Sequence, residues 1–114
     1  MVSQYLVQFD TGYADTIKVP KLILKNFKEI GIKPNEWSFY CLISYLQAEG
    51  QEIPSQPELG AMMGLSERQV KNIIADLKNR GLLKVKRAMK GKGPVYDFKP
   101  LFQKALDIEY EYMA

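Results

Sequence analysis

The chain has 114 residues, of which 46% are hydrophobic, so one small domain with its own core is expected. It has no histidine and a single cysteine, which excludes a Ser-His-Asp triad, a Cys-His pair, a His/Cys zinc site and an internal disulfide. The net charge is only +3, and the sequence has no Walker A pattern, signal peptide or apolar run of membrane-spanning length. The composition therefore predicts a cytoplasmic protein that is not an enzyme and needs no cofactor or metal.

The first predicted elements are two strands over residues 5–9 and 16–19, joined by a turn at 10–12 to form a hairpin. Pro20 then opens a helix as its first residue. Apolar residues at helical spacing carry this helix to Gly31, which ends it.

A long helix is predicted over 34–48, and it is apolar on two sides. One stripe consists of Phe39, Leu42, Ile43 and Leu46, and the other of Trp37, Tyr40, Cys41 and Tyr45. A helix that is apolar on both sides is buried on both sides, so this one is expected at the centre of the domain, with Cys41 as a small buried hydrophobe.

Two capping boxes define a helix-turn-helix over residues 55–81. Ser55 with Glu58, and Ser66 with Gln69, have the Ser-x-x-Glu/Gln spacing in which the side chains cap each other's backbone N–H groups. Gly64 and Gly81 stand where each helix has to stop. The second helix, over 66–80, is predicted to be the recognition helix that enters the major groove of DNA.

At 100° per residue, the apolar residues of this second helix form one stripe that faces the core. The opposite face carries Arg68, Asn72, Ala75 and Asn79, with Gln69 and Lys71 on its flanks. Arg68 suits guanine, and Asn72 or Gln69 suits adenine. Lys71 and the hydroxyl group of Ser66 are expected on phosphates. The alternative is that these are ordinary surface residues.

A β-hairpin wing is predicted over 82–98. Its inward residues are Leu83, Val85, Tyr96 and Phe98, while Lys84 and Lys86 point outward. The tip at 87–94 contains two glycines and three basic residues, Arg87, Lys90 and Lys92. We expect this tip on the DNA backbone or in the minor groove, where it adds affinity and little base specificity.

The positive charge is concentrated on this motif. Residues 64–93 contain nine Lys or Arg and two acids, a net charge of +7, and the remainder of the chain carries −4. A basic block over a helix-turn-helix indicates a phosphate-binding face. The alternative is a solvated charged face, which is common, but the location on this motif favours DNA binding.

A last helix is expected over 100–114 as a connector with an acidic outer face, following a winged-helix domain over 1–99. The apolar surfaces of helices 34–48 and 100–114 can be satisfied inside one subunit or in a homodimer. The predicted fold is α+β and mainly α: a winged helix-turn-helix with a β-hairpin wing, an N-terminal strand/helix extension and a C-terminal helix.

Several segments resemble the N-terminal winged-helix domain of plasmid and phage replication initiators of Gram-positive bacteria, the RepA and DnaD-like replisome-organiser group. They are residues 17–22, 32–36, 54–60, 64–70 and 77–82. The resemblance implies sequence-specific binding of double-stranded DNA at a replication origin, often as a dimer, with a further C-terminal domain recruiting helicase-loading proteins. Two alternatives stay open: a transcriptional regulator of the same fold, and a replisome protein-interaction domain with weak, nonspecific DNA binding.

Overall fold

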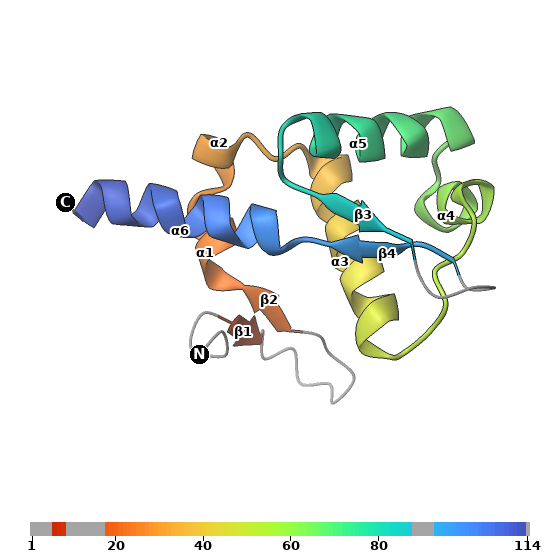
Figure 1. Ribbon diagram of the computed structural model, residues 1–114, viewed down its shortest axis with the longest axis horizontal. Coiled ribbons are helices and arrows are strands. Elements are labelled where there is room, and N and C mark those ends of the chain that lie inside the picture. The colour runs from red at the N-terminus through yellow and green to blue at the C-terminus, as the bar shows by residue number, and fades with distance from the viewer. Residues whose placement is uncertain (1–5, 9–17, 88–92, 114) are drawn as a thin grey trace.

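The computed structural model describes residues 6–8, 18–87 and 93–113 (Figure 1). Within these residues it contains six helices and two sheets of two strands each. The elements are β1 (Leu6–Gln8), β2 (Lys18–Pro20), α1 (Lys21–Lys25), α2 (Phe27–Ile30), α3 (Pro34–Ala48), α4 (Gln56–Met63), α5 (Glu67–Asn79), β3 (Lys84–Lys86), β4 (Val95–Asp97) and α6 (Lys99–Met113). The predicted class, mainly helical α+β with a β-hairpin after the helix-turn-helix, is confirmed.

The N-terminal hairpin is also confirmed, because β1 and β2 pair antiparallel with Val7 opposite Val19. The predicted turn at 10–12 lies outside the described residues. The prediction that Pro20 is the first helical residue is wrong. Pro20 pairs with Leu6 as the last residue of β2, and its extended backbone (φ −70°, ψ 118°) places it at the N-cap of α1 instead.

The single helix predicted after Pro20 is two short helices, α1 and α2, separated by Asn26. The backbone of Asn26 leaves the helical region (φ −109°, ψ 25°), and its side-chain amide donates to the carbonyl oxygen of Leu22 at 2.9 Å. An asparagine that bonds to nearby backbone in this way competes with the helix. Gly31 ends α2 in the left-handed conformation, as predicted.

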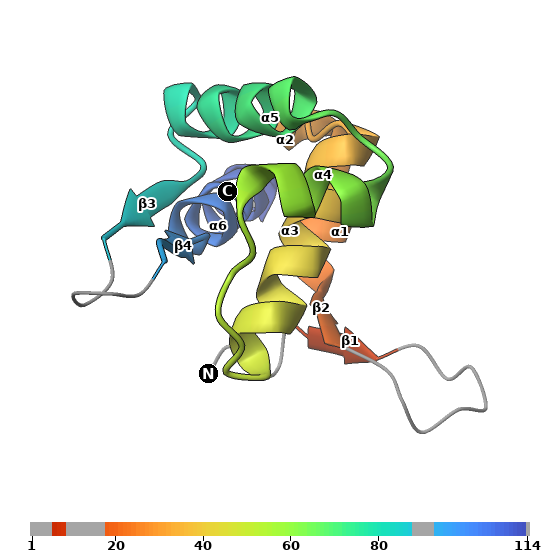
Figure 2. The same cartoon turned by 90° about the vertical axis from the view of Figure 1, so that its right-hand side faces the viewer.

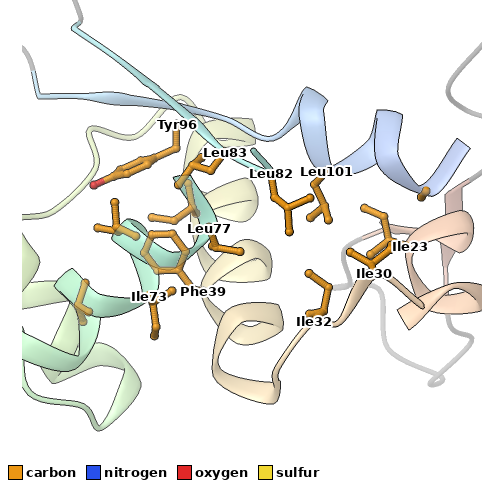
Figure 3. Close-up of a cluster of buried hydrophobic side chains, with 14 of the residues drawn as sticks. Ile23, Ile30, Ile32, Phe39, Ile73, Leu77, Leu82, Leu83, Tyr96 and Leu101 are labelled. Atoms are coloured by element: carbon orange, nitrogen blue, oxygen red, sulfur yellow. The ribbon is translucent and has the colours of Figure 1, made fainter. Parts of the chain in front are cut away.

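Helix α3 has the predicted bounds and lies at the centre of the domain (Figure 1). Phe39 and Ile43 are fully buried, and Figure 3 shows the Phe39 ring close to side chains of α5. The second stripe is less buried than predicted: Cys41 is half-buried and Tyr45 is 39% exposed. Aromatic contacts partly cover this side of α3, such as Tyr40 on Phe98 with ring centroids 4.9 Å apart.

Helix α6 packs against the N-terminal helices and contributes to the same core. Leu101, Ala105 and Ile108 are buried in one cluster with side chains of α1, α3 and α5, and Figure 3 shows Leu101 in this cluster. Lys25 of α1 also pairs with Glu109 at 2.8 Å. The division of the chain after residue 99 stays a prediction. No helix in the described part of the chain has the length and apolarity to span a membrane.

Candidate nucleic-acid interface

The helix-turn-helix is built as the capping boxes predicted. The hydroxyl oxygen of Ser55 accepts from the N–H of Glu58 at 3.4 Å, and that of Ser66 accepts from the N–H of Gln69 at 3.1 Å. In return, the backbone N–H groups of Ser55 and Ser66 donate to the side-chain oxygens of Glu58 and Gln69, which closes both boxes. Gly64 and Gly81 adopt left-handed φ angles of +72° and +71°, and so end α4 and α5.

One glycine that packs against the turn was missed by the sequence reasoning. Gly60 lies inside α4, where its carbonyl oxygen accepts the N–H of Leu65 at 2.7 Å. A Cβ atom at this position would lie only 2.5 Å from the carbonyl oxygen of Leu65. The turn that leads into α5 can therefore lie this close to α4 only because residue 60 has no side chain.

Helix α5 presents the predicted two faces. Val70, Ile73, Ile74 and Leu77 are buried against the core, and Figure 2 shows the helix lying along the outer surface of the domain. The residues predicted on its free side are all exposed: Ser66, Arg68, Gln69, Lys71, Asn72, Ala75 and Asn79. The structure thus brings the predicted reading residues onto one accessible surface, while their contact with DNA stays a prediction.

The capping box at Ser66 makes Asn72 a better candidate than Gln69 for recognising adenine. The Gln69 side-chain oxygen already accepts the N–H of Ser66 at 2.8 Å. Bidentate recognition of adenine needs both the amide oxygen and the amide nitrogen of a side chain. Asn72 has both available, so it is the better candidate, whereas the Gln69 oxygen is held toward the backbone of Ser66 by the cap.

Lys71 forms an ion pair with Glu67 one turn earlier, at 3.0 Å. Both side chains are about half exposed, 59% and 46%, so the pair is weak and a phosphate can compete with it. The assignment of Lys71 to a phosphate is therefore compatible with this geometry.

A groove of about 680 Å³ runs beside α5, between this helix and the first turn of α3. Its lining residues are Lys33, Pro34, Asn35, Glu36, Asn72, Ile73, Ala75, Asp76 and Asn79. Three members of the free face of α5, Asn72, Ala75 and Asn79, therefore form one wall of this groove.

Arg80 is the main polar residue that sequence reasoning did not interpret. It was counted in the basic block, yet its guanidinium group donates to Glu36 at 3.0 Å and to Asp76 at 3.1 Å. Hydrogen bonding with Glu36, and then with Arg80, lowers the pKa of Asp76 below its ordinary value. Asp76 and Arg80 are four residues apart on one helix, and this spacing could have predicted that they pair.

The wing is present, with Val85 opposite Tyr96 in an antiparallel pair. Of its predicted inward residues, Leu83 and Tyr96 are buried and Val85 and Phe98 are half-buried. Lys84, Lys86 and Arg87 are exposed, as predicted, whereas Lys90 and Lys92 lie outside the described residues.

Gln47 of α3 holds the wing in place, and this contact was also missed. Its side-chain amide accepts the N–H of Tyr96 at 2.9 Å and donates to the Tyr96 carbonyl oxygen at 3.0 Å. One glutamine thereby occupies the outer edge of β4 as a neighbouring strand would. The result is a wing with a defined position relative to α3.

The positive charge of segment 64–93 is partly compensated by acids from outside it. Arg80 pairs with Glu36, and Lys86 pairs with Asp97 at 3.4 Å. The cationic side chains of the described face that remain exposed without such external partners include Arg68, Lys84 and Arg87. The count of +7 thus overstates the charge that this face offers to a phosphate backbone.

Comparison with known proteins agrees with this architecture. The family model of the DnaD N-terminal domain matches residues 19–113. The crystal structure of the N-terminal domain of DnaD protein from Geobacillus kaustophilus HTA426 superposes with a TM-score of 0.68 and 26% sequence identity, covering 84% of this chain and 81% of that one. A search of curated proteins finds no significant match. The predicted resemblance to DnaD-like replisome organisers is confirmed, and the chain belongs to the DnaD N-terminal domain family.

Proposed function

We propose that this winged-helix domain binds double-stranded DNA in a sequence-specific manner at a replication origin. Helix α5 enters the major groove, and the wing segment 87–94 follows the backbone or the minor groove. The observation that carries the proposal is the free face of α5, where Arg68 and Asn72 are exposed opposite the buried Val70 and Ile74. Membership of the DnaD N-terminal domain family favours a role in replication over one in transcription.

The proposal divides the interface into two kinds of contact. Arg68 and Asn72 read base edges, because their side chains match guanine and adenine in the major groove. The remaining predicted residues position the domain on phosphates: Ser66, Gln69, Lys71, Lys84, Lys86, Arg87, Lys90 and Lys92. In this scheme the Gln69 side chain, held by its cap, contacts the DNA backbone through its amide N–H₂ group rather than a base.

A titration of the protein against an origin-derived duplex and a random duplex, each at two salt concentrations, tests the proposal. Base reading predicts that the preference for one duplex persists at the higher salt, while the affinity for both falls because phosphate contacts release counterions. Equal affinities for the two duplexes at both salt concentrations would contradict sequence-specific binding.

The second candidate function is a protein-interaction winged helix with weak, nonspecific DNA binding. It is favoured by a groove of about 620 Å³ between α3 and α6, whose apolar floor includes Tyr40, Phe98 and Leu106. The compensation of Arg80 and Lys86 by acids points in the same direction. The partners in this scheme are replisome or helicase-loading proteins in the cytoplasm.

A homodimer is part of either scheme. Tyr110 on α6 is 63% exposed and Tyr45 on α3 is 39% exposed, so both helices retain apolar surface. Sedimentation of the intact chain and of Leu106→Asp measures this directly. A dimer through the α3–α6 side predicts a smaller particle for the variant, and identical particles would contradict it.

A further inference from the structure

Three helix ends meet at the guanidinium group of Arg80. Its Nη1 atom donates to both carboxylate oxygens of Glu36, at 3.0 and 3.1 Å, and to Asp76 at 3.1 Å. Its Nη2 atom donates to the carbonyl oxygens of Ile30 at 3.0 Å and Gly31 at 2.7 Å. One side chain therefore connects the end of α5 with the start of α3 and the end of α2.

The junction depends on the planar fork of arginine. Glu36 is only 3% exposed, and its carboxylate also caps α3 by accepting the N–H of Lys33 at 2.9 Å. A lysine can place one ammonium group near Glu36, but it cannot also span to the carbonyl groups at the end of α2. The contact thus fixes the direction of α5 relative to α3 as well as neutralising a buried charge.

The same junction borders Asn72, one of the two residues proposed to read bases. Glu36 and Asp76 line the 680 Å³ groove together with Asn72 and Asn79, and Asn79 directly precedes Arg80. A change in the angle of α5 at this end moves the Asn72 amide relative to a base pair. Base-edge hydrogen bonds tolerate little displacement, because they weaken steeply with distance and angle.

We propose that Arg80 is a positioning residue that sets the angle of α5 and, through it, the base preference of the domain. This inference rests on the proposed function, in which α5 reads the major groove. Arg80 itself stays off the DNA: its side chain is 28% exposed and is engaged with two carboxylates and two backbone carbonyl groups. Its removal should leave the salt dependence of binding unchanged, unlike the removal of a phosphate contact.

The test compares variants that differ in the geometry of the side chain at position 80, in charge, and in the position of the changed residue. Arg80→Lys keeps the charge and loses the fork. The double variant Glu36→Gln/Arg80→Gln removes both partners, so no unpaired buried charge remains and a folded sample is expected. Lys78→Gln removes one exposed charge from the same helix as a matched control, and Arg68→Ala reports base reading. Binding to a selected and a random duplex is measured at several salt concentrations, with hydrogen exchange of the amides of residues 72–79.

In folded Arg80→Lys and in the double variant, the preference for the selected over the random duplex is expected to fall about fivefold or more. This loss is comparable to losing one base-reading residue. Their salt slopes stay at the wild-type value, the amides of 72–79 exchange faster, and Lys78→Gln keeps the wild-type preference. A folded Arg80→Lys or double variant with the wild-type preference would overturn the proposal. So would a reduced salt slope in the double variant, or loss of folding in every Arg80 variant, which would make Arg80 a stability residue alone.

Failure of the proposed function has a different signature. In that case wild type and Arg68→Ala bind both duplexes equally. The exchange rates then decide the positioning role on their own: faster exchange over 72–79 in folded Arg80→Lys supports it, and unchanged rates contradict it.

Discussion

The Nη1 atom of Arg80 donates to both carboxylate oxygens of Glu36 across 44 positions of the chain. Glu36 is buried and Arg80 is only 28% exposed in its side chain, so this pair is shielded from solvent in a way that the pairs of Lys71 and Lys86 are not. A shielded pair of this kind leaves an uncompensated charge when one member is removed.

Arg80→Ala is therefore expected to lower the free energy of unfolding by about 3–5 kcal/mol, the range found when one partner of a buried pair is lost. Urea denaturation followed by circular dichroism measures the change. Lys78→Ala, on the exposed face of the same helix, is the control and should change stability by less than about 0.5 kcal/mol. Similar losses in the two variants would show that the Glu36 contact does not stabilise the fold.

Gly60→Ala should destabilise the domain, although glycine to alanine inside a helix normally stabilises by about 1 kcal/mol. The added methyl group would lie 2.5 Å from the carbonyl oxygen of Leu65, which is backbone and cannot move aside cheaply. Gly64→Ala is the matched control, since it meets no atom within 4 Å and carries only the strain of its φ of +72°. In thermal unfolding, Gly60→Ala should have a lower melting temperature than Gly64→Ala. A stabilised Gly60→Ala would contradict the close packing of the turn against α4.

Acid should destabilise the fold partly through Asp76. Hydrogen bonding with Glu36 and Arg80 holds its folded-state pKa below the usual 3.8, so the unfolded chain binds its proton at higher pH. The stabilisation is complete above the unfolded-state pKa and is lost as the pH falls through the folded-state value. Unfolding free energies measured from pH 5 downward should fall more steeply for wild type than for Asp76→Asn. If the unfolding free energies of wild type and Asp76→Asn fall in parallel with pH, Asp76 does not contribute to the acid destabilisation.

Replacing both Lys90 and Lys92 by glutamine should weaken binding to all duplexes and flatten the salt dependence by up to about two units of slope. The expectation follows from the position of the two lysines between β3 and β4, at the predicted tip of the wing. Lys104→Gln/Lys99→Gln on α6 removes the same charge elsewhere and serves as the control. An unchanged slope in the wing variant would mean that the wing does not contact DNA.

The helix-turn-helix was predictable from sequence because its signals are local. Ser55, Ser66, Gly64 and Gly81 each act within four residues, and the structure has them in the predicted roles. The apolar stripe of α5 was equally predictable, because a helix with one solvent-exposed face has apolar residues that repeat with the helical period.

The contacts that position the site were not predictable in this way, because they join residues far apart in the chain. Arg80 meets Glu36, Gln47 meets Tyr96, and Asn26 meets Glu109 only once the core has formed. A charge count cannot separate such a structural arginine from a surface one, which is why the basic block was overestimated. The break at Asn26 has one such distant contact, to Glu109 of α6, beside its local bond to the carbonyl oxygen of Leu22.

Arg68→Ala should relax the base preference at a single position of the DNA site and cost about 1–3 kcal/mol of binding there. Its side chain is exposed near the start of α5, the part of a recognition helix that reaches base edges. Affinities for the selected site and for a random duplex measure the effect. An equal loss on both duplexes would assign Arg68 to the phosphate backbone.

The most direct test of the central claim is selection of bound sequences from a pool of random duplexes, with wild type and Arg68→Ala in parallel. Base reading by α5 predicts that wild type enriches one motif, and that the variant enriches the same motif with one position relaxed. Failure of wild type to enrich any sequence above the starting pool would contradict sequence-specific recognition by this domain.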